Sequence, residues 1–242
     1  MTAIKISNLT KKYGNLLAVN NLNLEIKKGE LFSLLGVNGA GKTTTIKMLT
    51  CLLKITTGDA IILGKSIKTD ADAVRGIIGI SPQETAVAMG LSVKENLELM
   101  CGVYGFNKEK TKKKILELTE EFSLKEIFNI KAGKLSGGWQ RRLSIATALI
   151  GEPKILFLDE PTLGLDVIAR SELWETIRSL KKKTTIILTT HYMEEAESLS
   201  DRIGIMKKGS LIALGTVDEL KEKANKEKFE DAFITLVKES KL

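Results

Sequence analysis

A glycine-rich run near the N-terminus carries the clearest chemistry in the sequence. Gly36-Val37-Asn38-Gly39-Ala40-Gly41-Lys42-Thr43 has the pattern G-x-x-x-x-G-K-[ST]. A strand-like apolar segment precedes it and a helical pattern follows it, so the glycines lie on a strand-to-helix turn that directs backbone N–H groups and a helix dipole at phosphate oxygens. Lys42 is expected to reach the β- and γ-phosphates, and Thr43 to bind Mg²⁺. We therefore expect residues 36–43 and Thr44 to hold a triphosphate.

Two adjacent carboxylates, Asp159 and Glu160, follow the apolar segment at residues 155–158. An aspartate at the end of such a strand is the second half expected of a P-loop site, where it holds Mg²⁺ directly or through water. Glu160 is then placed to orient or deprotonate the attacking water. The alternative is that the pair caps a helix that begins near Pro161.

His191 is the only histidine in the chain and follows the apolar segment at residues 186–190. Because the carboxyl ends of parallel strands meet at one edge of an open sheet, we expect it on the same rim as the P-loop and Glu160. There it suits a hydrogen bond to a γ-phosphate or to the attacking water, whereas a metal-ligand role would need His or Cys partners. Gln83 follows residues 77–80 at this rim, although by itself it also fits an ordinary turn.

These residues depend on an α/β fold, which the apolar pattern predicts. Short apolar segments alternate with helical patterns from residue 31 to about residue 206, which is typical of a largely parallel sheet covered by helices. The predicted core strands are residues 31–35, 77–80, 155–158 and 185–188. Residues 3–28 and 58–68 predict an antiparallel β-layer beside this core, and residues from about 90 to 150 show helical patterns alone.

The composition narrows the class of protein. A chain of 242 residues with 43% hydrophobic residues fits one large α/β domain. Its two cysteines, Cys51 and Cys101, are too few for a disulfide framework, which fits a reducing cytoplasm. The first residues lack a signal-peptide pattern and no apolar run approaches the ~18 residues that span a bilayer, so we expect neither feature.

The charge of the chain is moderately basic. A formal net charge of +7 favours phosphates or anionic headgroups without being extreme. Lysines gather at residues 108–114, where a helical pattern begins, and we expect a solvated face there. Aromatic residues make up 5% of the chain and do not interleave with these lysines, so we expect no nucleic-acid partner.

The run Leu135-Ser136-Gly137-Gly138-Trp139-Gln140 resembles the signature motif of the ATP-binding cassette (ABC) family, and the other motifs occur in the family's order. Physically, it predicts a serine N-cap and paired glycines that open a helix, a second helix N-terminus suited to an anion. Val37 stands where the family often has Pro, and Trp139 where it often has Gln. Neither departure removes a phosphate-contacting group.

The resemblance extends to about residue 216 and implies a role for each motif. Tyr13 would stack on adenine, residues 36–43 would form the Walker A loop, and Gln83 the Q-loop. Residues 155–160 resemble the Walker B strand, residues 163–166 the D-loop, and His191 the switch histidine. The implied cofactors are ATP and Mg²⁺, with catalytic Lys42, Glu160 and His191, and with Thr43, Gln83 and Asp159 around the metal.

In that family two cassettes enclose two ATP molecules head to tail, each Walker A loop facing the signature motif of its partner. The resemblance therefore implies that this single-cassette chain acts as a homodimer or in a pseudo-symmetric heterodimer. Ser136, Gly137 and Gly138 would contact the nucleotide across the dimer.

Two further runs indicate a branch of the family. Residues 190–197 and 215–220 are similar to ATPase subunits of ABC-2-type exporters. The implied function is ATP hydrolysis that powers export through a separate polytopic membrane permease, from a cytoplasmic, peripheral position on the inner face of the cell membrane. The alternative is a soluble ABC-type ATPase not coupled to transport. A regulatory subunit without turnover would be expected to lack Glu160 or His191.

We expect an ABC nucleotide-binding domain at residues 1–220, with a helical subdomain at about residues 88–150, and a short amphipathic helical tail at residues 221–242. The tail carries an apolar stripe at helical spacing: Phe229, Ala232, Phe233, Leu236 and Val237. We expect this stripe to dock on its own domain, and the alternative is a contact with the partner ATPase or the permease.

Overall fold

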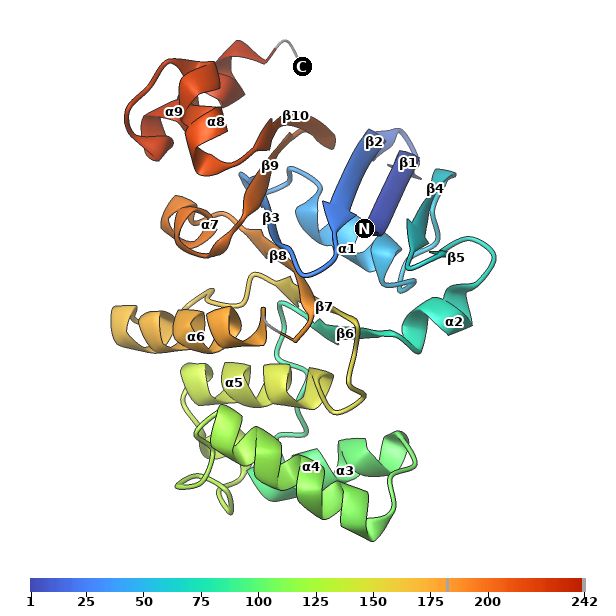
Figure 1. The fold of residues 1–242 in the computed structure, drawn as a ribbon, viewed down its shortest axis with the longest axis vertical. Coiled ribbons are helices and arrows are strands. Elements are labelled where there is room, and N and C mark those ends of the chain that lie inside the picture. Colours follow the sequence, from blue (N-terminus) through green and yellow to red (C-terminus); the bar gives the residue numbers. More distant parts are fainter. Residues whose placement is uncertain (182, 241–242) are drawn as a thin grey trace.

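A six-stranded sheet forms the centre of the computed structural model, which describes residues 1–181 and 183–240 (Figure 1). The strand order is β10-β9-β3-β8-β7-β6, and β10 alone runs antiparallel to its neighbour. The strands are β3 (Leu31–Gly36), β6 (Ile78–Ser81), β7 (Ile155–Asp159), β8 (Thr185–Thr190), β9 (Arg202–Lys207) and β10 (Ser210–Gly215). All four predicted core strands are confirmed, and so is the α/β fold.

A second sheet is antiparallel and has the order β2-β1-β4-β5. Its strands are β1 (Thr2–Tyr13), β2 (Leu16–Lys27), β4 (Thr57–Ile62) and β5 (Lys65–Ser66). They fall within the regions where the sequence predicts the antiparallel layer, apart from the first residue of β1 and of β4. The layer packs on one side of the central sheet together with α1 (Lys42–Leu49), and α2 (Ala71–Arg75) leads from it into β6.

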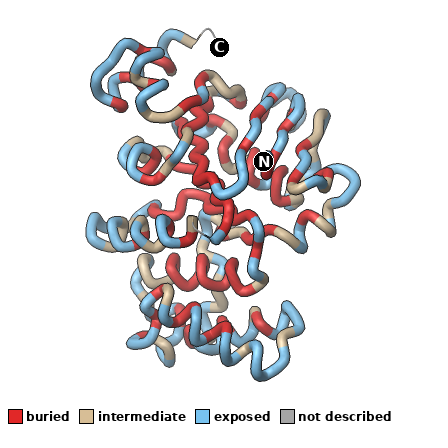
Figure 2. The backbone as a smooth tube through the Cα atoms, in the orientation of Figure 1, coloured by how far each residue is buried: buried red, intermediate tan, exposed pale blue. Residues whose placement is uncertain are grey.

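Successive side chains of the central strands point to opposite faces of the sheet, so the sheet contributes to two hydrophobic cores. On β7, Ile155 and Phe157 face the antiparallel layer and α1, whereas Leu156 and Leu158 face the helices on the other side. Both sets are fully buried, and the central strands stand out as the buried part of the backbone in Figure 2. A strand buried on both faces is a rigid support for side chains at its carboxyl end.

Helices α3 (Val93–Val103), α4 (Lys108–Glu121) and α5 (Gly137–Ala148) form the far end of the molecule, with a short 3₁₀ turn at Ala132–Lys134. Ser92 begins α3 through a capping box with Glu95, and the side chain of Asn107 caps α4. These helices share one core with α6 (Val167–Leu180) and α7 (Met193–Leu199).

The lysine-rich start of α4 is only partly solvated. Lys108, Lys110, Lys112 and Lys113 are exposed, as the sequence predicts. Lys114 is buried and pairs with Glu117 and Glu152, at 3.1 and 3.5 Å. The prediction of a solvated face is therefore wrong for Lys114, because the helical period turns this residue toward the core.

The C-terminal helices α8 (Val217–Ala224) and α9 (Phe229–Glu239) lie together beside β9 and β10 (Figure 1). The side chains of Phe229, Phe233 and Leu236 are buried in one cluster with residues of α7, β9 and β10. Lys207 on β9 donates to the carbonyls of Val237 and Ser240, which secures the end of α9. The stripe thus docks on its own domain, as expected.

Helix α8 includes residue 220 and ends at Ala224, and residues 225–228 separate it from α9. The domain boundaries drawn from the sequence remain a proposal.

Within residues 1–181 and 183–240, no helix has both the length and the apolar character that a membrane crossing needs. Cys51 and Cys101 are free thiols.

Candidate active site

The P-loop connects β3 to α1, as the sequence predicts, and its backbone requires glycine. Gly41 has φ of +100°, and a Cβ there would lie 2.5 Å from the carbonyl oxygen of Ala18. Gly36 is equally confined, because a Cβ would lie 2.6 Å from the carbonyl oxygen of Met206. The first turn of α1 presents backbone N–H groups that have no acceptor within the helix, as at any helix N-terminus.

A pocket of about 720 Å³ opens beside this loop. Its lining joins the P-loop to the end of β1, to the segments after β6, β7 and β8, and to the hairpin between β9 and β10. The lining residues are Tyr13, Leu16, Leu17, Ala18, Asn38, Gly39, Ala40, Gly41, Lys42, Thr43, Thr44, Gln83, Glu160, Leu163, His191 and Lys208. The structure therefore brings together most of the predicted site residues.

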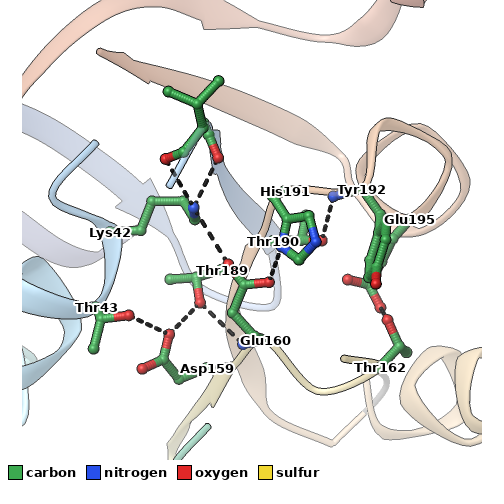
Figure 3. Close-up of polar contacts among 12 residues, drawn as sticks. Lys42, Thr43, Asp159, Glu160, Thr162, Thr189, Thr190, His191, Tyr192 and Glu195 are labelled. Atoms are coloured by element: carbon green, nitrogen blue, oxygen red, sulfur yellow. Dashed lines mark hydrogen bonds and ion pairs between the residues drawn. The ribbon is translucent and has the colours of Figure 1, made fainter. Parts of the chain in front are cut away.

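Lys42 is buried at the base of the pocket, with 5% of its surface exposed. Its ammonium donates to the carbonyl of Gly36 at 2.7 Å and to that of Val37 at 3.4 Å. The same nitrogen lies 3.2 Å from Oε1 of Glu160 (Figure 3). Gly36 and Val37 therefore orient the lysine through their carbonyls rather than by lining the pocket.

Thr43 and Asp159 meet below the pocket. The Thr43 hydroxyl donates to Oδ1 of Asp159 at 3.2 Å, and Asp159 is buried at the end of β7. Thr189 on β8 donates to the same carboxylate oxygen, and its own hydroxyl accepts from the backbone N–H of Glu160 at 3.1 Å. Sequence reasoning missed Thr189, because only the register of β8 with β7 places it opposite Asp159.

Glu160 and His191 are in direct contact, with 2.5 Å between Oε2 and Nδ1 (Figure 3). Glu160 has φ of +50°, a left-handed conformation that is uncommon for a residue with a side chain. Such backbone strain persists only when the surroundings hold it in place. Here the N–H of Glu160 is fixed by both the carbonyl and the hydroxyl of Thr189.

The alternative reading of Asp159 and Glu160 as a helix cap is wrong. The next helix, α6, begins at Val167, and the side chain of Asp166 caps it by accepting from the N–H of Ala169 at 2.9 Å. The carboxylates therefore remain free to face the P-loop.

Gln83 lines the pocket from the segment that follows β6. Arg141 on α5 holds this segment, since its guanidinium donates to the carbonyls of Pro82 and Gln83. Burial lowers the pKa of Arg141, against the opposing effect of nearby Asp159 and Glu195. Sequence reasoning missed Arg141, because a bond to a distant backbone carbonyl leaves no local pattern.

The remaining predicted residues lie at the mouth of the pocket or away from it. Tyr13 lies at the mouth and is 46% exposed. Ser136 occupies the N-cap position of α5, as predicted, but its hydroxyl makes no capping bond. Ser136, Gly137 and Gly138 do not line the pocket formed by the described residues, and a Cβ at Gly138 would meet Ala169 of α6 at 3.2 Å. Within one chain, the signature segment is thus apart from the P-loop.

A P-loop at the carboxyl edge of a parallel sheet, with an aspartate that ends β7 and meets the P-loop threonine, defines a P-loop nucleotide-binding protein. Residues 19–163 match the family described as ABC transporter, and the chain belongs to this family.

Two similar proteins are named as ATP-binding proteins. The probable multidrug ABC transporter ATP-binding protein YbhF of Escherichia coli (strain K12) is 43% identical over 242 residues, which is 98% of this chain and 42% of YbhF. The doxorubicin resistance ATP-binding protein DrrA of Mycobacterium tuberculosis (strain ATCC 25618 / H37Rv) is 40% identical over 225 residues, covering 92% of this chain and 68% of DrrA. The chain thus spans less than half the length of YbhF.

A solved structure, described as a dimeric post-hydrolysis state of the ATP-binding cassette MJ0796 bound to ADP and Pi, has the same fold. It superposes with a TM-score of 0.79 at 30% identity, covering 88% of this chain and 98% of that one.

Proposed function

We propose that the chain hydrolyses ATP and that this hydrolysis powers export of a substrate through a separate membrane permease. The contact between Glu160 and His191, at the wall of the P-loop pocket, carries the catalytic part of the proposal. A carboxylate held by an imidazole and lying beside a phosphate-binding loop suits a general base for water. Lys42, whose ammonium already faces Glu160, supplies the positive charge for the phosphates.

The nucleotide would lie along the pocket, with its phosphates on the P-loop and its base toward Tyr13. Residues 38–44 line the pocket at the start of α1, where a helix N-terminus favours phosphate, and Tyr13 offers an exposed ring at the mouth. His191 would then contact the γ-phosphate or hold the water that Glu160 deprotonates. Each role follows from position in the pocket and awaits a test by substitution.

The oxygen atoms beside the P-loop suit Mg²⁺. The hydroxyl of Thr43 and a carboxylate oxygen of Asp159 lie 3.2 Å apart, and hard oxygen donors of this kind are what Mg²⁺ prefers. No group of three or more His, Cys, Asp and Glu side chains that could hold a metal occurs among residues 1–181 and 183–240. Thr43, Asp159 and Gln83 would therefore hold the ion together with the phosphates and water. Bound there, Mg²⁺ neutralises charge on the phosphates.

A dimer would complete the site. Ser136, Gly137 and Gly138 open α5 but lie outside the pocket of their own chain, so they are available to a nucleotide bound by a second cassette. MJ0796, which shares the fold, is described as dimeric. We propose a homodimer or a pseudo-symmetric heterodimer, with no nucleic-acid partner.

The family and the drug-resistance names of DrrA and YbhF support coupling to export. The permease would be a polytopic membrane protein, and the chain would lie on the cytoplasmic face of the membrane as a peripheral subunit. A soluble ABC-type ATPase that is not coupled to transport remains the second candidate.

Two measurements test the proposal. Purified chain should release phosphate from ATP only with Mg²⁺, and chelation by EDTA should abolish release; tight ATP binding without release would contradict the catalytic claim.

A neighbouring reading frame should encode a polytopic membrane protein that co-purifies with the chain from detergent. Its absence, with ATPase activity intact, would favour the soluble ATPase.

A further inference from the structure

A buried glutamate on α7 makes contacts that the proposed function does not use. Glu195 is 0% exposed, although Glu194 and Glu197 on the same helix are exposed. Its Oε1 accepts from the hydroxyl of Thr162 at 2.8 Å and from the indole N–H of Trp174 at 3.0 Å. Its Oε2 has no hydrogen-bond partner among the residues that the structure describes. A buried carboxyl with one unpartnered oxygen is costly, so its position calls for a physical reason.

The two donors belong to the segment that carries the general base and to the helix that follows it. Thr162 lies two residues after Glu160, in a turn where the N–H of Leu163 bonds to the carbonyl of Glu160. Trp174 lies on α6, directly after this turn. Glu195 itself lies in the first turn of α7, four residues after His191. One carboxyl oxygen therefore ties together the two chain segments that carry Glu160 and His191 (Figure 3).

This tie matters because the Glu160 backbone is strained and because the position of its carboxylate depends on the contact with the His191 imidazole. Glu160 adopts φ of +50°, and its Oε2 is 2.5 Å from Nδ1 of His191. The bonds from Thr189 fix the N-terminal side of Glu160, whereas Thr162 fixes the segment on its C-terminal side. Without the second anchor, the turn and α7 can shift relative to each other, and a displacement of about 1 Å at a reacting group can lower a rate by about 100-fold.

We infer that Glu195 is a positioning residue for hydrolysis: its buried carboxyl joins the turn after Glu160 to the helix after His191 and so sets the carboxylate–imidazole contact. The inference rests on the proposed function for its catalytic consequence, and on the structure alone for the geometry of the pair.

The chemistry of the site suits a neutral carboxyl group. Burial raises the pKa of Glu195, against the opposing effect of the nearby hydroxyls of Thr190 and Thr162 and of the Trp174 indole. A glutamine has the same shape and keeps the acceptor that Thr162 and Trp174 need, whereas methionine has a similar volume and no such acceptor. The two substitutions therefore separate the hydrogen bonds from the packing.

The test compares Glu195→Gln, Glu195→Met and the control Glu197→Met in the full chain. Because His191 is the only histidine, the Hε1 proton of its imidazole gives one NMR signal that reports on its contact with Glu160. We expect Glu195→Met to move this signal and to lower kcat by about 10- to 100-fold with little change in KM for Mg-ATP. Glu195→Gln and Glu197→Met should leave the signal and kcat close to those of the native chain.

A native signal and native kcat in Glu195→Met would overturn the inference, and so would an equal loss in Glu195→Gln. If Glu195→Met does not fold, Thr162→Val and Thr162→Ser decide, because only serine keeps the hydroxyl. The valine variant should then move the imidazole signal and the serine variant should not, and identical spectra would overturn the inference. If the native chain hydrolyses no ATP, the proposed function fails, while the NMR comparison still tests the role of Glu195 in the geometry.

Discussion

The ammonium of Lys42 lies 3.2 Å from a carboxylate oxygen of Glu160, and both side chains are almost fully buried. Removing one partner leaves a buried charge with fewer compensating contacts. We expect Lys42→Met to lower the free energy of unfolding by about 1–3 kcal/mol. Combined with Glu160→Gln, the loss should be smaller than the sum of the two single losses. Urea denaturation of the four chains measures this coupling, and strictly additive losses would contradict the pairing.

The stability of the chain should depend on pH through Glu195. Burial raises the pKa of this carboxyl in the folded chain above its ordinary value of 4.5, the charge of Glu160 acts in the same direction, and Arg141 lies within electrostatic reach. The folded state therefore keeps a proton that the unfolded state releases, and stability falls as pH rises above about 4.5 toward the folded pKa.

Glu195→Gln removes this titration. Its melting temperature relative to the native chain should therefore rise as the pH increases above about 4.5, until the buried carboxyl of the native chain has ionised. Glu197→Gln, on the exposed side of α7, should show no such trend. Scanning calorimetry over this range provides the comparison, and a difference independent of pH would show that the carboxyl titrates normally.

The C-terminal helix α9 should contribute to the stability of the domain. Phe229 is 2% exposed within the cluster that joins α9 to α7, β9 and β10, whereas Ile234 on the same helix is 39% exposed. Phe229→Ala should lower the free energy of unfolding by about 3–5 kcal/mol, and Ile234→Ala by less than about 0.5 kcal/mol.

Deleting residues 226–242 should lower the melting temperature and spare ATP binding, since none of the pocket residues belongs to that segment. A truncated chain that melts like the native one but loses its partner would reveal an interface instead.

Much of the fold follows from local patterns, because each predicted core strand is a short, mostly apolar run between segments of a different pattern. The P-loop, Asp159, Glu160 and His191 were predictable for the same reason, since the carboxyl ends of parallel strands meet at one edge. Gln83 lies at the same edge. Residues 38–43 of the P-loop, Gln83, Glu160 and His191 line one pocket, and Asp159 contacts Thr43 beside it.

The supporting residues were not predictable, because their role depends on contacts across the fold. Glu195 is one of three glutamates in residues 194–197, and the sequence does not indicate which one faces Trp174. Lys114 likewise belongs to a run of lysines until the packing of α4 buries it. Thr189 is one of two adjacent threonines in β8, and only the register of β8 with β7 places it opposite Asp159.

Completion of the site by a second chain can be tested by mixing two inactive variants. Ser136→Arg should disrupt the signature segment, and Lys42→Ala should disrupt the P-loop, so each alone should have little activity. A heterodimer of the two contains one composite site with both native elements and should recover part of the turnover. Recovery should scale with the fraction of heterodimer, measured with two affinity tags. Failure to recover in purified heterodimers would count against completion across the dimer.

The most direct test of the account is the ATPase activity of Glu160→Gln. The substituted amide can still accept a hydrogen bond from Lys42 but cannot take a proton from water. With Mg-ATP, the variant should bind nucleotide as tightly as the native chain, hydrolyse it about 10²- to 10⁴-fold more slowly, and accumulate as an ATP-bound dimer. Glu197→Gln, the same change of carboxylate to amide on the exposed side of α7, serves as a matched control outside the pocket. Hydrolysis by Glu160→Gln at the native rate would contradict the assignment of Glu160 as the base, and with it the mechanism proposed for this chain.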